Sequence, residues 1–483
     1  MPVEIMLRIF LFATRIDDCK KCRMAPLRLR GEECSCKLPS QFLVSSACRR
    51  WRDVALQYPL LWTTLRLSCR MPMDFVRLLV ARATSQNLIN SEGSAPPCLD
   101  FHLTLRDSDL ESSDNLETLL YVIVAEHKRW CGLRIVAPST SGPFTTIRGG
   151  LAKLAVPRLE SLEIICLDGY RSSKDDWHVP PVLDIFRGGA PSLQRIELRG
   201  CSLSSSNLDN AFSMREFSVI AGPCMTKDVR LLAAVAAGLT HLAFVDQCTA
   251  DWHEGENTRS PLRFSSLRGL RISGARCFVQ FLQLLEAPEL ERLQVEDLHV
   301  DGVDVLGDCF EGTTALTPVV ARLPRLRWLG LEIHAISTNN PSLVLKRLRH
   351  FVAAFPCIRH LVFSGPDVVA FVRELRAGHS TPAGALLPAL ECLILSGAHG
   401  HDLLCEVAAL AEARKAVGCP LRNIQLSITV TTSRQDLPQK FCKILQMQFR
   451  GTRTTGVIYP DGETWMHSTH EREEWRTTEY LHR

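Results

Sequence analysis

A short phrase of apolar residues recurs along most of this 483-residue chain and constrains its fold more than any other feature. Each copy spaces its apolar residues as L-x-x-L-x-L, as in Leu159, Leu162 and Ile164, and many copies carry a proline two residues earlier. The last two apolar positions alternate with polar residues, which is typical of a β-strand with one buried face. Ten copies begin at Leu159, Leu193, Met214, Leu239, Leu267, Leu290, Leu326, Ile358, Leu390 and Leu421, and looser copies lie near Trp62, Leu99 and Trp130.

Segments with helical spacing of apolar residues lie between many of these strands, for example at 343–355, 367–376 and 402–417. One strand and one helix cannot bury their own apolar faces, so successive units must stack. The array resembles leucine-rich repeats, with irregular spacing, and only Cys201 stands where regular repeats carry Asn or Cys.

The sequence therefore predicts an α/β protein with an irregular leucine-rich-repeat-like β/α solenoid over 68–432. A C-terminal helix and tail are expected over 433–483, with the helix at 436–449. Segment 139–150 is expected to be a loop.

A different pattern precedes the array. The opening residues predict a helix with Ile5, Ile9 and Phe10 on one side, and segment 42–56 predicts a second helix. The pairs Tyr58-Pro59 and Leu61-Trp62 follow it. About sixty residues with so few large apolar groups are marginal in isolation, so they are expected to pack against the array or a partner.

The motifs of this segment resemble those of the F-box family, in particular the F-box-like proteins abundant in mushroom-forming fungi. The resemblance covers residues 1–67 and is interrupted by a Cys-rich loop at 15–41. It implies a short three-helix module that docks the Skp adaptor of cullin–RING ubiquitin ligases. Trp51 would be either an aromatic anchor of that interface or an internal aromatic residue. The positions that match the family pattern are Pro2, Ile5, Ile9, Leu43, Cys48, Trp51, Leu61 and Trp62.

The inserted loop contains a cysteine cluster with a spacing that suggests metal binding. Its four thiols belong to Cys19, Cys22, Cys34 and Cys36, which could close a tetrahedral zinc site or remain exposed. We predict neither a bound metal nor a cofactor. Most other cysteines stand singly in apolar patterns and are expected to be buried reduced thiols of a cytoplasmic or nuclear protein, among them Cys131, Cys201, Cys357 and Cys392.

The charge of the chain favours neither a nucleic-acid partner nor a membrane surface. Lys and Arg total 56 against 52 Asp and Glu, and the net charge of +4 is spread along the sequence. No phosphate-binding, zinc-protease or nucleophile-elbow motif is present in the sequence. We therefore expect a protein that is not an enzyme.

The polar residues of the predicted strands define a candidate binding face. Residues between the buried strand positions, and those just after them, should point to the concave side of the array. Such a mixed polar face suits protein binding and equally suits a solvated surface. The candidates are Glu163, Glu197, Arg199, Arg271, Ser273, Gln294, Glu296, Glu332 and Gln425.

Two functions follow from this organisation. The first is a substrate-recognition adaptor of a Skp–cullin–F-box ubiquitin ligase, in which the N-terminal module docks the Skp-type adaptor and the solenoid holds an unidentified protein substrate. The alternative is an interaction scaffold whose F-box is degenerate and which recruits no ligase.

Overall fold

The computed structural model describes residues 2–16, 40–84, 97–105, 113–138, 141–166, 182–204, 213–220, 226–245, 261–273, 281–282, 284–298, 322–333, 345, 348–349, 351–365, 367–377, 387–397, 400–429 and 453–459. Within these ranges the fold is mixed α/β, and its long strands pair in parallel. The chain divides into two compact units. Unit 1 holds the described residues up to Ser204, and unit 2 holds those from Ser213 onward.

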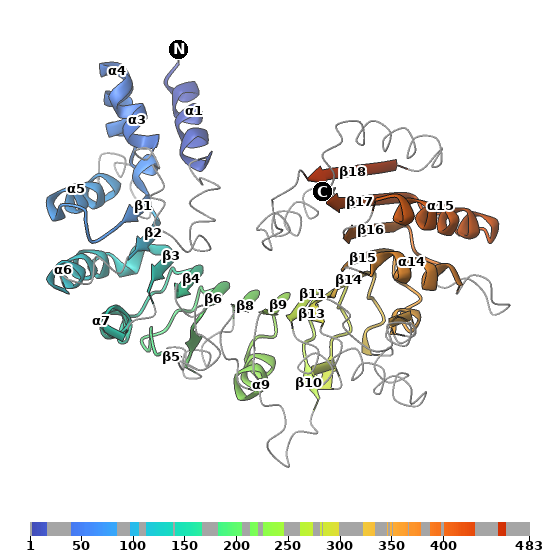
Figure 1. The fold of residues 1–483 in the computed structure, drawn as a ribbon. Coiled ribbons are helices and arrows are strands. Elements are labelled where there is room, and N and C mark those ends of the chain that lie inside the picture. The colour runs from blue at the N-terminus through green and yellow to red at the C-terminus, as the bar shows by residue number, and fades with distance from the viewer. Residues whose placement is uncertain are drawn as a thin grey trace. The chain divides into compact units, whose positions relative to one another are not determined.

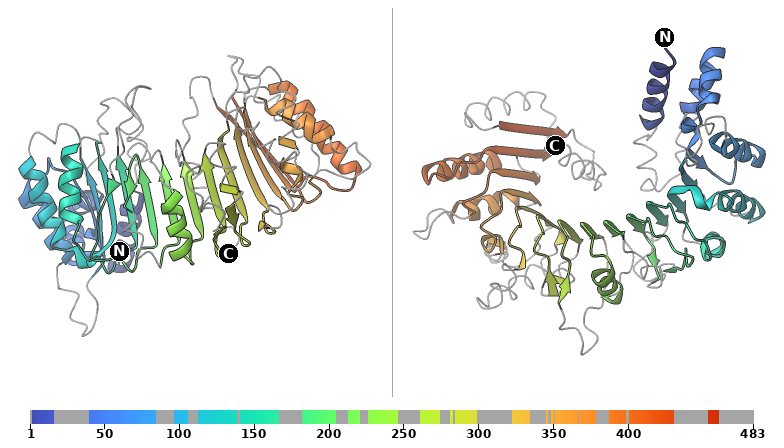
Figure 2. Two further views of the ribbon diagram at one scale, coloured as in Figure 1. Left: turned by 90° about the horizontal axis from the view of Figure 1, so that it is seen from below. Right: turned by 180° about the vertical axis from the view of Figure 1, so that it is seen from behind.

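Unit 1 begins with a helical module and continues into a parallel sheet with the order β1-β2-β3-β4-β6. The module comprises α1 (Val3–Ile16), α3 (Ser40–Ala47), α4 (Arg49–Gln57) and the 3-10 helix η2 (Pro59–Trp62). Helices α5, α6 and α7 lie on one face of the sheet (Figures 1 and 2). The elements after the module are β1 (Thr64–Leu67), α5 (Met73–Thr84), β2 (Leu99–Thr104), α6 (Ser113–Val124), η5 (His127–Arg129), β3 (Trp130–Ala137), α7 (Ser141–Leu151), β4 (Ser161–Cys166), β5 (Val182–Leu183), β6 (Arg195–Arg199) and β7 (Ser202–Leu203).

Unit 2 contains parallel strands in the order β8-β9-β11-β13-β14-β15-β16-β17-β18. Helices α9, α14 and α15 lie on one face of these strands (Figure 1). In each unit, we call the face of the sheet that the helices leave uncovered the open face. The elements are β8 (Glu216–Ile220), α9 (Thr226–Val235), β9 (His241–Val245), β10 (Leu262–Arg263), β11 (Gly269–Ser273), β12 (Leu285–Glu286), β13 (Arg292–Leu298), β14 (Trp328–Ile333), β15 (His360–Ser364), α14 (Val368–Ala377), β16 (Cys392–Gly397), α15 (Gly400–Ala416), β17 (Asn423–Thr429) and β18 (Arg453–Tyr459).

The recurring phrase coincides with the strands, and its apolar positions form the core. Leu329, Leu361 and Leu393 lie opposite one another on β14, β15 and β16, and all three are fully buried. The first apolar position of a copy, such as Leu326 or Ile358, is also buried, in the turn before the strand. The predicted phase of the repeats is therefore confirmed, since parallel pairing in register places equivalent apolar residues side by side.

One segment predicted as a loop is a helix. Helix α7 occupies residues 141–150 of the segment 139–150, in spite of Gly149 and Gly150. It buries Phe144 and Ile147 in unit 1. The burial of Phe144 and Ile147 on one side of this helix therefore outweighs the low helix propensity of the two glycines.

Two other expectations need correction. The single helix predicted at 42–56 is two helices, α3 and α4, which are interrupted at Cys48. Strand β18 carries no copy of the phrase and lies in the expected tail, yet it pairs with β17. The predicted helix at 436–449 lies outside the described residues.

Candidate functional site

The N-terminal module has a small internal core of its own. One face of α1 buries Met6 and Phe10, and the ring of Phe10 lies 5.1 Å from that of Trp51 on α4, measured between centroids. Helix α1 packs against both α3 and α4. Ile5 and Ile9, which were expected to share a side with Phe10, lie instead on an exposed flank of the helix. From α1, the core of the module is therefore filled by Met6 and Phe10, while about half of each of these two isoleucine side chains remains exposed.

Cys48 separates α3 from α4 because its backbone is extended, with φ −159° and ψ 168°. Its thiol accepts a hydrogen bond from the backbone N–H of Trp51, at 3.4 Å. An acceptor at this position satisfies one of the N–H groups left unpaired at the start of a helix. This cap sets the direction of α4 and places Trp51 against α1.

Trp62 joins the module to the first strand of unit 1. Its indole N–H donates to the carbonyl of Ala55, at 2.8 Å, and its ring makes an edge contact with Phe42. The guanidinium carbon of Arg82, on α5, lies 4.7 Å from the centroid of the Trp62 ring. Trp62 is completely buried, and the neighbouring Leu61 is almost completely buried. These two matches to the F-box pattern therefore lie in the interior.

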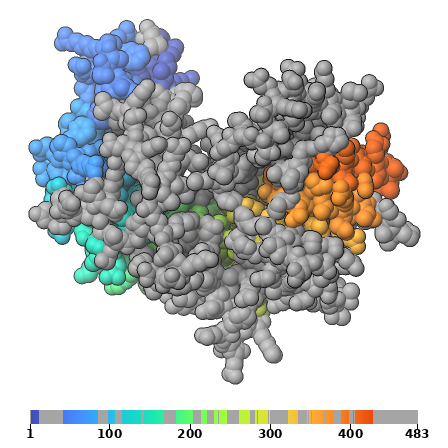
Figure 3. Space-filling view, in the orientation of Figure 1, coloured from blue at the N-terminus to red at the C-terminus, as the bar shows by residue number. Residues whose placement is uncertain are grey.

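The other matches to the F-box pattern lie at or near the surface of the module, whose residues are drawn in blue in Figure 3. Trp51 is half-buried. Sequence reasoning missed three further exposed apolar side chains here, which are those of Val3, Leu56 and Leu60. The matches that are exposed are Pro2, Ile5, Ile9, Leu43 and Cys48.

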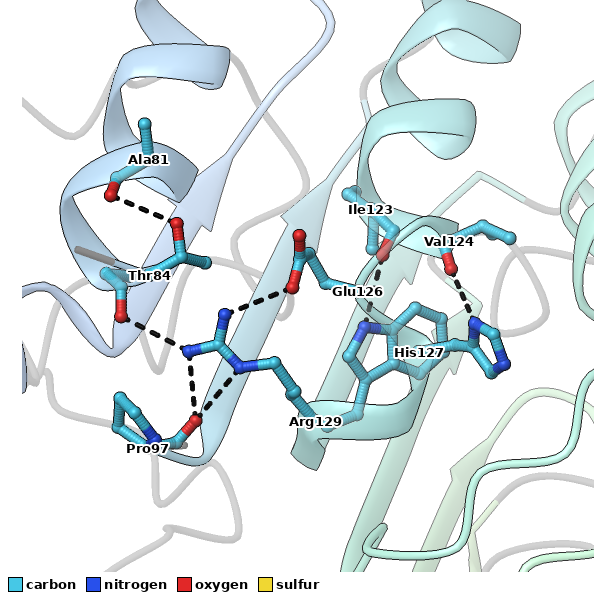
Figure 4. Close-up of polar contacts among 10 residues, drawn as sticks. Ala81, Thr84, Pro97, Ile123, Val124, Glu126, His127 and Arg129 are labelled. Atoms are coloured by element: carbon cyan, nitrogen blue, oxygen red, sulfur yellow. Dashed lines mark hydrogen bonds and ion pairs between the residues drawn. The ribbon is translucent and has the colours of Figure 1, made fainter. Parts of the chain in front are cut away.

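A second tryptophan of unit 1 makes the same kind of hydrogen bond as Trp62. The indole N–H of Trp130 donates to the carbonyl of Ile123, seven residues earlier, at 3.2 Å. Next to it, Arg129 donates to the carbonyls of Ala83 and Pro97 and pairs with Glu126 (Figure 4). Ala83 and Ile123 lie in the last turns of α5 and α6, where carbonyls lack an N–H partner within the helix. Both tryptophans can be recognised in the sequence, because each stands at the first position of a looser copy of the recurring phrase, at 62 and 130.

The open face of unit 1 carries one continuous row of ionisable residues. The guanidinium of Arg134 in this row is 3.4 Å from the carboxylate of Glu163. Sequence reasoning named the two glutamates and missed the other three residues, although they occupy the same position of the looser copies. The row is formed by positions that lie opposite one another on neighbouring strands, namely Arg66, His102, Arg134, Glu163 and Glu197.

Two members of this row also contact ionisable residues on their own strands. Arg199 lies 2.7 Å from the carboxylate of Glu197, two residues away on the same strand. His102 lies 3.2 Å from Asp100, likewise on its own strand. The predicted residues Glu163, Glu197 and Arg199 are therefore brought together at one site.

Burial raises the pKa of the Glu163 carboxyl, and the adjacent carboxylate of Glu197 raises it further. Arg134, Arg199 and His102 act in the opposite direction without cancelling the shift. Two like charges at the same level of neighbouring strands repel each other, so the arginines on either side stabilise this part of the face.

In unit 2 the predicted residues form a second polar cluster. Arg271 donates from Nε and Nη2 to the two carboxylate oxygens of Glu296, at 2.7 and 2.9 Å. The side-chain amide of Gln294 also donates to Glu296. Glu296 and Ser273 are predicted to belong to an accessible polar face, either binding or solvated, but both side chains are buried. The remaining two candidates, Glu332 and Gln425, are half-buried on β14 and β17.

The cysteines differ in part from expectation. Cys98 and Cys131 form a disulfide, so Cys131 is not the solitary reduced thiol that its sequence context predicted. Their Cα atoms lie 5.6 Å apart near the start of neighbouring strands, within the span of a disulfide. Cys201 and Cys392 are buried as predicted, whereas Cys357 is exposed.

The candidate zinc ligands Cys19, Cys22, Cys34 and Cys36 lie outside the described residues. Within the part of the chain that is described, no group of three or more metal-ligating side chains comes together. Among the described helices, none has the length and apolar character needed to cross a bilayer.

No protein-family model matches the sequence, and no curated protein matches it.

Proposed function

We propose that this protein is a substrate-recognition adaptor of a Skp–cullin–F-box ubiquitin ligase. In this proposal the N-terminal module docks the Skp-type adaptor, and the strand and helix units stack as an irregular leucine-rich-repeat-like solenoid whose open face holds a protein substrate. The chain performs no bond chemistry. It raises the effective concentration of the substrate near a ubiquitin-charged enzyme.

The observation that carries the proposal is the exposure of large apolar side chains on a module whose core is already closed. Ile5 and Ile9 lie one turn apart on α1 with 48% and 43% of their surface exposed, and Leu43 on the neighbouring α3 is 45% exposed. Met6 and Phe10 fill the interior without them. Clustered apolar surface that folding does not use is typical of a site that binds another protein.

The test measures binding of the purified full-length chain to a purified Skp-type adaptor by biolayer interferometry. The variant Ile5→Ser/Ile9→Ser should bind at least about 30-fold more weakly, which corresponds to the loss of one interface hot spot. Leu78→Ser is the matched control, because Leu78 is an aliphatic side chain on α5 with 44% exposure. The control should bind within about twofold of wild type, since surface substitutions away from an interface have little effect.

The alternative function is a scaffold with no ligase role. It would be favoured if the wild-type chain fails to bind the Skp-type adaptor, or if the Ile5→Ser/Ile9→Ser variant binds as the wild type does. Thermal melting of each variant shows whether the module remains folded.

A further inference from the structure

The open face of unit 2 changes character between β13 and β14. One row of positions crosses the strands of this unit at the same level. On β8, β9, β11 and β13 the row carries polar or small side chains, which are those of Ser218, Ala243, Arg271 and Gln294. On β14, β15 and β16 the same row carries Gly330, Val362 and Ile394.

The burial of the neighbouring residues assigns this row to the open face. Val362 lies between Leu361 and Phe363 on β15, and both of these side chains are fully buried in the helix-covered core. Ile394 on β16 has the same setting, because the leucines on either side of it are also buried. Successive side chains of a strand point to opposite faces, so Val362 and Ile394 lie on the open face.

Trp328 extends this apolar row along β14. A Cβ atom added to Gly330 would lie 2.6 Å from the Trp328 ring, so the indole rests directly on the bare backbone of Gly330. Trp328, Val362 and Ile394 are each half-buried. We call Trp328, Gly330, Val362 and Ile394 the apolar strip.

Polar and ionisable side chains border the apolar strip. At the level of Trp328, Arg292 lies on β13 and His360 on β15. On the β13 side, the carboxylate of Glu296 is occupied by Arg271 and Gln294. The row that follows the strip in the open face carries one carboxylate, that of Glu332, and two serine hydroxyls. An apolar centre within a polar rim is typical of a surface that binds an apolar side chain of another protein.

A hydrogen-bond acceptor lies on β17, next to the Ile394 end of the apolar strip. The Asn423 side chain hydrogen-bonds the thiol of Cys392, and its Oδ1 atom is buried without a donor from any described group. Burial raises the pKa of the Cys392 thiol to about 11, so this thiol is neutral at pH 7.

An acceptor without a donor is unfavourable, and a ligand that supplies an N–H would remove that cost. Asn423 as a whole is only half-buried, so a ligand seated on the open face can reach its amide after a rotation of the side chain.

The size of the apolar strip indicates a peptide rather than a second copy of the chain. Three neighbouring strands span about 10 Å, because adjacent strands lie about 4.8 Å apart. A stable protein dimer buries about 1,200–2,000 Å² in total, which is far more than four residues provide. A single large apolar side chain and the backbone next to it match the strip in length.

We propose that the apolar strip binds a segment of the protein substrate that presents one large apolar side chain next to an N–H donor. The side chain lies against Trp328, Val362 and Ile394, and the N–H donates to Asn423 Oδ1. This inference rests on the proposed function, since it names the kind of substrate segment that the open face holds.

The experiment selects dodecapeptides from a displayed random library on the purified full-length chain and measures the enriched peptides by fluorescence anisotropy. The enriched peptides should share one large apolar residue, and its replacement by serine should weaken binding at least about 30-fold. Ile394→Lys should have an effect of the same size. Ala243→Lys is the matched control, because Ala243 is half-buried in the same row of the open face on β9. It should stay within about twofold of wild type.

A second variant at the same position shows whether Ile394→Lys loses binding only because it misfolds. Ile394→Thr keeps the β-branched shape and replaces apolar surface by a hydroxyl, so it should fold and still weaken peptide binding. The inference is overturned if no peptide is enriched, if the enriched peptides share no apolar residue, or if they bind both Ile394 variants as they bind wild type. Binding of the Skp-type adaptor should be unchanged in both variants, so a failure here is distinguishable from a failure of the proposed function.

Discussion

Replacement of Trp62 by phenylalanine separates an internal role for this residue from a role in docking. The substitution removes the indole N–H that donates to the carbonyl of Ala55 at 2.8 Å, and this carbonyl keeps only the longer bond from the backbone N–H of Tyr58, at 3.4 Å. Loss of one intramolecular hydrogen bond costs about 0.5–1.5 kcal/mol. The smaller ring leaves about 40 Å³ empty, which costs about 1 kcal/mol at about 24 cal/mol per Å³. We therefore expect Trp62→Phe to destabilise the module by about 1.5–2.5 kcal/mol.

Hydrogen exchange followed by mass spectrometry measures this loss locally, which suits a chain that contains two compact units. Protection of peptides that cover α4 and η2 should fall at least about tenfold, since each 1.4 kcal/mol or so is about a factor of ten. Leu60→Ser is the matched control, because Leu60 is exposed in the same 3-10 helix. It should change protection by less than about threefold. Unchanged protection in Trp62→Phe would refute the internal role, and lost binding of the Skp-type adaptor in the same variant would assign Trp62 to the docking surface.

Three further predictions concern the sheets. Leu361→Asp buries an unpaired charge in the middle of unit 2, so limited proteolysis should show that this unit unfolds, and a resistant variant would contradict the assigned phase. Glu163→Gln should raise the melting temperature at pH 7.5 and leave it unchanged below about pH 4. The raised pKa of Glu163 means that the wild type loses stability as pH rises from about 4.5 through the folded-state value; a lower melting temperature at pH 7.5 would contradict this. Glu296→Leu should lower the free energy of unfolding, measured in urea, by about 3 kcal/mol because it removes the carboxylate that pairs with Arg271. The double variant that also carries Arg271→Met should regain much of this loss. A double variant no more stable than the single one would contradict the pairing.

The positions of the strands and their buried residues could be predicted from the sequence because both depend on a local pattern. Apolar side chains at alternate positions can be buried only if the segment is extended and one face is covered. Leu329, Leu361 and Leu393 meet in the core for this reason, and the same kind of pattern located α14 and α15 by their helical spacing. The residues between the buried positions could likewise be assigned to the open face.

Tertiary structure decided which residues of the N-terminal pattern are exposed. Trp62 and Ile5 are both apolar matches to the same family pattern, yet Trp62 is fully buried and Ile5 is exposed, since burial depends on which helices pack against each side chain. The disulfide between Cys98 and Cys131 also depends on two strands that are distant in sequence coming together.

The apolar strip has the same origin. Gly330, Val362 and Ile394 are about thirty residues apart and occupy the same position of three copies of the phrase, so the sequence assigns each to the open face without showing that they adjoin. Only the parallel register of the sheet makes them neighbours, because hydrogen bonding between strands fixes which residues lie at the same level.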